Sequence, residues 1–135
     1  MKKSNKIFAA VFVLTVIVHC TLNIDNCKAQ WIQTNGPYGG HISSFAVSGT
    51  NLFAGTGGGV FLSNNNGTTW TAVNNGLKKT NVSSLAVSGM NLFAGTYGGG
   101  VFRSTNNGTI WTAVGLTNTY VTSLEISGTN LFAGT

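Results

Sequence analysis

Acidic residues are nearly absent from this chain: Asp25 and Glu125 are the only two among 135 residues. Most glycosidases need a pair of carboxylates beside the bond that they cleave, and zinc sites need three or four His, Cys, Asp or Glu ligands. His41 has no second histidine, cysteine or aspartate near it in the sequence. The sequence therefore predicts no catalytic residues and no metal site in the chain as given.

Phosphate-binding loops are also missing. The glycine runs at 55–61 and 95–102 lack the Lys-Ser or Lys-Thr pair and the helix that such loops require. We interpret these runs as tight turns or bulges between strands, and we expect no cofactor.

Most of the positive charge lies in the first 28 positions. Three lysines precede an apolar run at 7–18, which is the order of a secretory signal. The run is shorter than the about 20 apolar residues that cross a bilayer. Cys27 and Ala29 are small residues at positions −3 and −1 relative to a cleavage site after Ala29. They predict a signal peptide over residues 1–29, with cleavage after Ala29. A lipoprotein signal ending at Cys20 is the alternative, and the bulky His19 disfavours it.

Cleavage after Ala29 would remove both cysteines, so the mature chain has no disulfide. It would keep Lys78, Lys79 and Arg103 against Glu125, which is too little positive charge for a nucleic-acid surface. We expect an exported protein, whether extracellular, at the cell surface or periplasmic. We expect no membrane insertion after cleavage and no nucleic-acid partner.

The mature chain is a repeat. The pentapeptide LFAGT stands at 52–56, 92–96 and 131–135, an interval of about 40 residues, which is typical of a repeat architecture. The repeat units are 42–81, 82–120 and a partial unit at 121–135. Residues 31–34 resemble the WTAV that ends each full unit, so we interpret them as an orphan outer strand.

Each full unit contains four strand candidates, rich in Val, Phe, Leu, Trp and Thr and separated by Gly and Asn. In the first unit they lie at 42–48, 52–56, 59–63 and 69–73. Four antiparallel strands in about 40 residues form a blade of a β-propeller. We therefore predict an all-β fold over 30–135, a partial β-propeller of about two and a half four-stranded antiparallel blades. The coils of a parallel β-helix, the rival fold, are usually shorter.

Alternation predicts which side chains share a face. In the fourth strand candidate, Trp70 and Ala72 would face one way and Thr71 and Val73 the other. Leu62 of the first unit is replaced by Arg103 in the second, which predicts that this position faces solvent.

Two octapeptides, SNNNGTTW at 63–70 and STNNGTIW at 104–111, resemble the Asp-box of BNR-repeat propellers. The residues that carry this turn motif are Ser63, Asn65, Gly67, Thr69 and Trp70 in the first copy and Ser104, Asn106, Gly108 and Trp111 in the second. Asn65 and Asn106 replace the aspartate, and Ile110 replaces a threonine. The resemblance implies a turn between the third and fourth strands of a blade, with a structural role.

Sialidases carry such boxes, and the resemblance would then imply an arginine cluster, a tyrosine nucleophile with a glutamate partner and an aspartate acid. This chain has one arginine, Arg103, and after cleavage one acid, Glu125. We expect a binding or scaffold surface with a protein or glycan partner, and further blades of the same protein. The alternatives are the N-terminal fragment of a sialidase-like glycosidase, with its catalytic residues in missing blades, and an assembly-factor or sensor propeller.

Two smaller features could contribute to binding. Glu125 stands where the other units have Ala46 and Ala86, on the strand that would line the central channel. The loop tyrosines 38, 97 and 120 could form an aromatic set that faces a ligand.

Overall fold

The computed structural model describes residues 36–135, which form strands and turns without a helix. The predicted signal peptide at 1–29 and the predicted strand at 31–34 lie outside this part of the chain. Within the described part, no segment is a helix of the length and hydropathy that a bilayer span requires.

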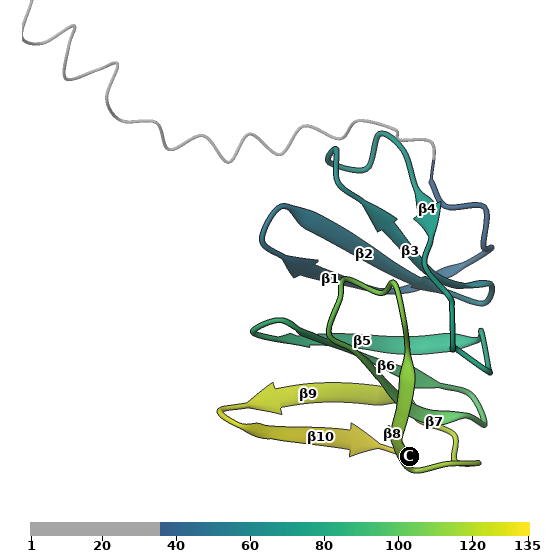
Figure 1. Cartoon of the computed structure of the whole chain (residues 1–135). Helices are drawn as coiled ribbons and strands as arrows, with labels where there is room; N and C mark the ends of the chain where they lie inside the picture. The colour runs from purple at the N-terminus through teal and green to yellow at the C-terminus, as the bar shows by residue number, and fades with distance from the viewer. Residues whose placement is uncertain (1–35) are drawn as a thin grey trace, which may run out of the picture. The chain divides into compact units, whose positions relative to one another are not determined.

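The strands form two four-stranded sheets and one hairpin (Figure 1). Sheet 1 contains β1 (Ile42–Ser48), β2 (Asn51–Thr56), β3 (Gly59–Ser63) and β4 (Thr71–Ala72). Sheet 2 contains β5 (Val82–Ser88), β6 (Asn91–Thr96), β7 (Gly100–Ser104) and β8 (Thr112–Gly115). The hairpin consists of β9 (Ser123–Ser127) and β10 (Asn130–Gly134).

Neighbouring strands are antiparallel and follow chain order in each sheet. The register repeats as well, because Phe53 pairs with Ala46, Phe93 with Ala86 and Phe132 with Glu125. The predicted all-β class, with four antiparallel strands in each full repeat, is confirmed.

The two sheets pack face to face through a core built from both. Phe53 and Val60 of sheet 1 are fully buried against sheet 2. Sheet 2 contributes a face of buried apolar side chains, namely Val82, Leu85, Leu92, Ala94, Phe102 and Trp111. A second, smaller core of Val101, Val121 and Leu124 joins sheet 2 to the hairpin.

The glycine of LFAGT permits this packing. A Cβ built on Gly55 would lie 2.7 Å from Val82 Cγ1, and one on Gly95 would lie 2.6 Å from Val121 Cγ1. Real Cβ contacts are not this short, so any larger residue would push the sheets apart. The glycine therefore serves the contact between sheets, near the end of the second strand.

Serine side chains add the same polar contact at both junctions. Ser43 Oγ donates to Gly55 O in its own sheet at 3.0 Å and to Val82 O of sheet 2 at 2.5 Å. Ser83 Oγ makes the equivalent pair with Gly95 O and Val121 O, at 3.0 Å and 2.5 Å. Each sheet is thus joined to the next by apolar packing and by one part-buried serine hydroxyl.

One strand is shorter than predicted, and one expectation about a side chain was wrong. The strand expected at 69–73 is reduced to β4, Thr71–Ala72. Its pairing agrees with the expected alternation, because Ala72 pairs with Phe61 and Thr71 with Leu62, while Val73 packs against the core between the sheets. Leu62 does not face solvent but packs against the core between the two sheets. Its counterpart Arg103 is exposed, since it lies toward the hairpin, whose two described strands do not extend over it.

Candidate functional site

The first box turn is closed by its own side chains. Ser63 Oγ donates to Asn65 Oδ1 at 3.0 Å and accepts from Gly67 N–H at 2.8 Å. Asn65 Oδ1 also accepts from Thr69 N–H at 2.9 Å, and Asn65 Nδ2 donates to Thr69 Oγ1 at 2.8 Å. The last bond uses an amide donor, which an aspartate would not supply.

The second box turn repeats this network with one bond fewer. Ser104 Oγ donates to Asn106 Oδ1 at 2.9 Å and accepts from Gly108 N–H at 2.9 Å. Asn106 Oδ1 accepts from Ile110 N–H at 2.9 Å, but isoleucine has no hydroxyl for the amide donor. In both turns the residues predicted from the sequence contact one another. Their polar groups are used within the turn, so few remain free to bind a ligand.

The two box tryptophans differ in their surroundings. Trp111 is only 3% exposed, and its Nε1 donates to Val73 O of sheet 1 at 2.7 Å. Trp70 is half-buried beside Phe45, with ring centroids 6.3 Å apart. Its Nε1 is buried but has no hydrogen-bond partner within residues 36–135. Only the second box is therefore bound to a preceding sheet in the described part of the chain.

The asparagine at the centre of each box makes a testable contribution to stability. We expect Asn65→Ala to lower the free energy of unfolding by about 1–2 kcal/mol, because the turn loses its side-chain bonds. Asn106→Ala should cost less, since Asn106 makes one bond fewer. Urea denaturation followed by tryptophan fluorescence measures both, with the exposed Asn64→Ala as control. A larger cost at Asn106 than at Asn65 would contradict this account.

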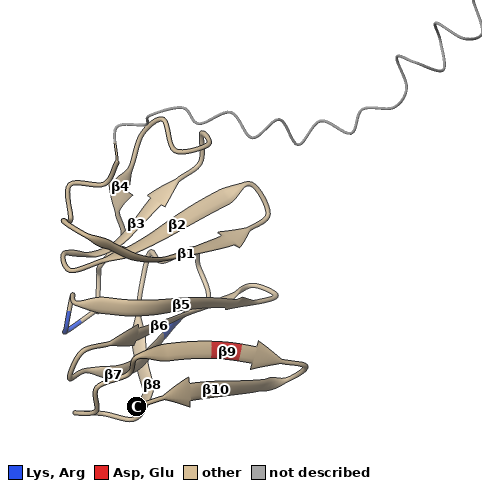
Figure 2. Cartoon of the chain, turned by 180° about the vertical axis from the view of Figure 1, so that it is seen from behind, with Lys and Arg blue, Asp and Glu red and all other residues tan. Residues whose placement is uncertain are grey.

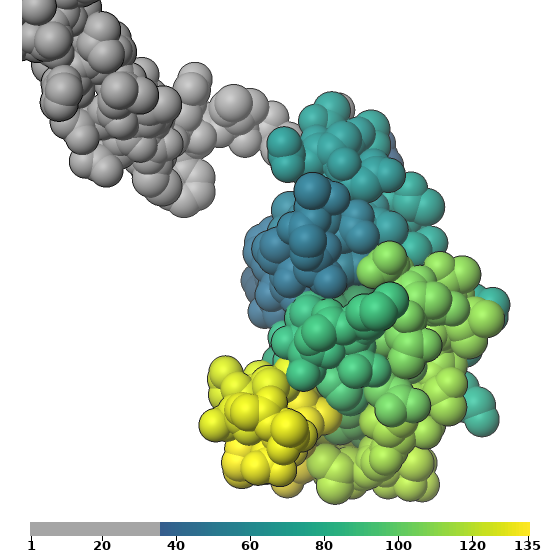
Figure 3. Space-filling view, turned by 60° about the vertical axis from the view of Figure 1, so that its left-hand side comes forward, coloured from purple at the N-terminus to yellow at the C-terminus, as the bar shows by residue number. Residues whose placement is uncertain are grey.

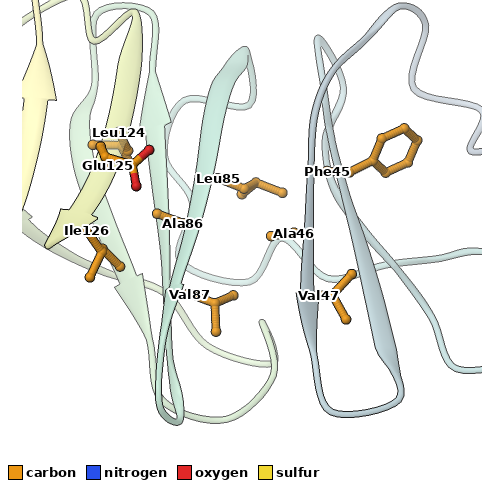
Figure 4. A pocket seen from close by; sticks show the side chains of 9 residues that line it. All are labelled: Phe45, Ala46, Val47, Leu85, Ala86, Val87, Leu124, Glu125 and Ile126. Carbon is orange, nitrogen blue, oxygen red and sulfur yellow. The ribbon is translucent and has the colours of Figure 1, made fainter. Parts of the chain in front are cut away.

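A groove crosses the first strands of the three repeats. Strands β1, β5 and β9 lie side by side, and three consecutive residues of each line a groove of about 380 Å³ (Figure 4). These residues are 45–47, 85–87 and 124–126. Because the register repeats, the groove presents three similar triplets in adjacent rows.

Glu125 is the one polar side chain in this lining. It is exposed, and it replaces the alanines at 46 and 86. Figure 2 marks this acidic position in red on β9 and the lysines in blue in the loop before β5. No three His, Cys, Asp or Glu side chains in the described part come together in a way that could hold a metal ion. The groove offers apolar contact and one negative charge.

The loop tyrosines do not form a single set. Tyr97 and Tyr120 pair edge to face, with ring centroids 6.0 Å apart, and their backbones form a β-bridge. Tyr38 is 97% exposed and makes no aromatic pair within the described residues. A smaller hollow of about 230 Å³ contains Lys78 and Lys79, apart from the groove.

The sequence did not indicate some of the residues that connect strands and sheets. Asn74 Oδ1 accepts from Val60 N–H at 2.7 Å and so extends the pairing between β3 and β4. The serines at 43 and 83 join the sheets, as described above. A hydroxyl residue recurs at this position in ISS, VSS and VTS, and this recurrence could have identified them from the sequence.

Comparison with known proteins leaves the family open. No protein-family model matches the chain, and no curated protein matches it. Among solved structures, the crystal structure of the computationally designed Ika4 protein is similar with a TM-score of 0.41 and 12% sequence identity. The match covers 78% of this chain and 91% of that chain. A likeness of this size carries no argument about fold or function.

Proposed function

We propose that this chain is an exported, non-catalytic repeat protein whose sheets are blades of a BNR-like β-propeller and whose role is to bind a partner. The repeated packing of successive sheets and the two box turns support the propeller. Export would be seen as a mature N-terminus at Gln30.

The groove across β1, β5 and β9 carries the binding proposal. In a propeller, the first strand of each blade lies nearest the central channel, so the groove would form part of the channel wall. Phe45 and Val47 are 55% and 63% exposed, and apolar side chains that remain exposed in a concave surface are typical of binding sites.

The lining favours a protein segment over a glycan. Glycans need many hydrogen-bonding groups, and among the lining side chains only Glu125 can accept a hydrogen bond. Apolar peptide side chains would gain from burial against Phe45, Val47 and Ile126, and a lysine or arginine could pair with Glu125. The proposed partner is therefore an extended peptide segment with apolar residues and one basic residue.

Selection from a phage-displayed peptide library on the exported protein tests this function. We expect enriched peptides to combine apolar residues with one lysine or arginine. Glu125→Gln, which keeps the shape but removes the charge, should weaken their binding up to about fivefold. Val47→Ser should also weaken binding by loss of apolar contact, whereas Val114→Ser, exposed on β8 outside the groove, should not. Enrichment on a glycan array alone, or peptide binding unchanged by both groove variants, would contradict the proposal.

A further inference from the structure

A hollow with two lysines lies where the loop before β5, the β6–β7 turn and the loop before β9 meet. We call it the lysine hollow, and its volume is about 230 Å³. The lining residues used below are Lys78, Lys79, Gly99, Phe102, Thr117 and Asn118. Figure 3 shows the second repeat, in green, between the blue first repeat and the yellow hairpin. The lysine hollow belongs mostly to this middle repeat and shares no residue with the groove.

No acidic residue of the described part neutralises the two lysines in this hollow. Glu125 is the only acid among residues 36–135, and it lines the groove instead. The side chains of Lys78, Lys79, Thr117 and Asn118 are exposed, so their donor groups are accessible. The hollow therefore combines two positive charges with an amide and a hydroxyl that can also donate hydrogen bonds.

The glycine turn beside the lysines lacks an acceptor that the first repeat supplies. In the first repeat, Gly58 N–H donates to Gly39 O and to Thr56 Oγ1, both at 3.0 Å. Gly99 stands immediately before β7 as Gly58 does before β3, and Lys79 stands three residues before β5 as Gly39 does before β1. Gly99 N–H has no acceptor within residues 36–135. An oxygen atom of a ligand could take the place of the missing carbonyl.

An extra residue in this turn, Tyr97, ties the walls of the hollow together. The turn is one residue longer than its counterpart in the first repeat. Tyr97 N–H donates to Asn81 O at 2.9 Å, and its ring packs edge to face on Tyr120. Gly100 N–H donates to Thr119 O at 3.2 Å. The three loops are thus connected before any ligand binds, which lowers the entropic cost of binding.

From these observations we propose that the lysine hollow binds a tetrahedral oxyanion, the sulfate or phosphate group of a small ligand. Lysine binds such groups as a point charge, and backbone N–H groups in turns form concave anion sites. A tetrahedral anion offers oxygens to donors that approach from several directions, whereas the two oxygens of a carboxylate would leave more of these donors unused. This proposal does not depend on what the groove binds.

The size of the lysine hollow limits what can carry the oxyanion. A volume of about 230 Å³ is below the about 300–1,000 Å³ of pockets for drug-sized ligands. The aromatic ring of Phe102 adds apolar contact within the same lining. The ligand is therefore a free ion or an ester on a single small ring, and not a long chain segment.

Titration of the exported protein with inorganic sulfate and with inorganic phosphate, followed by two-dimensional NMR of the backbone amides, tests this site. Exchange against chloride keeps the ionic strength constant. We expect the Gly99 amide signal to shift along a saturating curve, because the anion supplies its missing acceptor. The Gly58 amide is the internal control and should not move, since its N–H is already bonded. A Gly99 signal that shifts no more than that of Gly58 with either anion would overturn the proposal.

Charge variants separate this site from a general attraction of anions to the protein. Lys78→Gln and Lys79→Gln should each weaken sulfate binding by about two- to fivefold. Arg103→Gln removes the same charge outside the hollow and should leave sulfate binding unchanged. All three side chains are exposed, so their replacement leaves the core intact. Equal weakening by Arg103→Gln and by the lysine variants would mean that only net charge attracts the ion, and it would also overturn the proposal.

A sulfated sugar identifies the source of the oxyanion. N-acetylglucosamine 6-sulfate should shift the Gly99 amide signal, and N-acetylglucosamine without sulfate should not. Tighter binding of the sulfated sugar than of inorganic sulfate would assign the oxyanion to a sugar ester, and equal binding would assign it to the free ion. If both sugars bind equally well, the hollow does not recognise an anion and the proposal is wrong.

Discussion

Replacing Trp111 with alanine is expected to lower the free energy of unfolding by about 3–5 kcal/mol, the usual cost of removing a buried aromatic side chain. Trp111 is 3% exposed in the core between the two sheets. Its indole also donates to Val73 O at 2.7 Å, so the substitution leaves a part-buried carbonyl without its donor. Loss of both contacts weakens the junction between sheet 1 and sheet 2.

The same change at Trp70 is the matched control. Trp70 occupies the equivalent place in the first box, but it is half-buried and its indole N–H has no acceptor within the described residues. We expect a cost well below that of Trp111→Ala. Denaturant unfolding at one fixed protein concentration measures both. Equal costs for the two variants would contradict the structural difference between the boxes.

Gly76→Ala is expected to cost about 2–5 kcal/mol, from backbone strain and a steric clash together. Gly76 has a φ of +87°, which disfavours any side chain, and a Cβ built there would lie 2.3 Å from Trp111 O. The neighbouring Asn75 O accepts from Trp111 N–H at 2.8 Å. Movement that relieves the clash would therefore also break this bond between the loop after β4 and the second box.

Gly128→Ala separates the two contributions. Gly128 has a φ of +59° in the β9–β10 turn, with nothing within 4 Å of a built Cβ. The substitution there should cost only the backbone strain, about 1–2 kcal/mol. Thermal unfolding monitored by circular dichroism compares the two variants. If Gly76→Ala melts no lower than Gly128→Ala, the close contact between Gly76 and Trp111 is absent in solution.

Much of the local structure could be predicted from the sequence, because it depends on residues that are near one another in the chain. Alternating apolar residues bounded by Gly and Asn indicated the strands, and β1 and β3 have the predicted bounds. The Asn-Gly pairs of the boxes indicated turns, and Asn66 and Asn107 each have a φ of +55°. The side-chain bonds in those turns span at most four positions, a range within which residue chemistry is decisive.

The sequence pattern was a poor guide wherever burial depends on a neighbouring sheet. The Phe of LFAGT is fully buried at 53 and 55% exposed at 132, although the pentapeptides are identical. The box tryptophans differ in the same way. Leu62 was expected to face solvent because Arg103 replaces it, yet only Arg103 does so.

The sequence by itself determined the all-β class, the number of strands in each repeat and the chemistry of the box turns. The tertiary structure decided which repeated side chains are buried, why the glycine of LFAGT is needed, and that residues 45–47, 85–87 and 124–126 form one groove. The physical reason is distance along the chain. Contacts between sheets join residues about 40 positions apart, and their strength depends on which surfaces meet, which a single repeat does not encode.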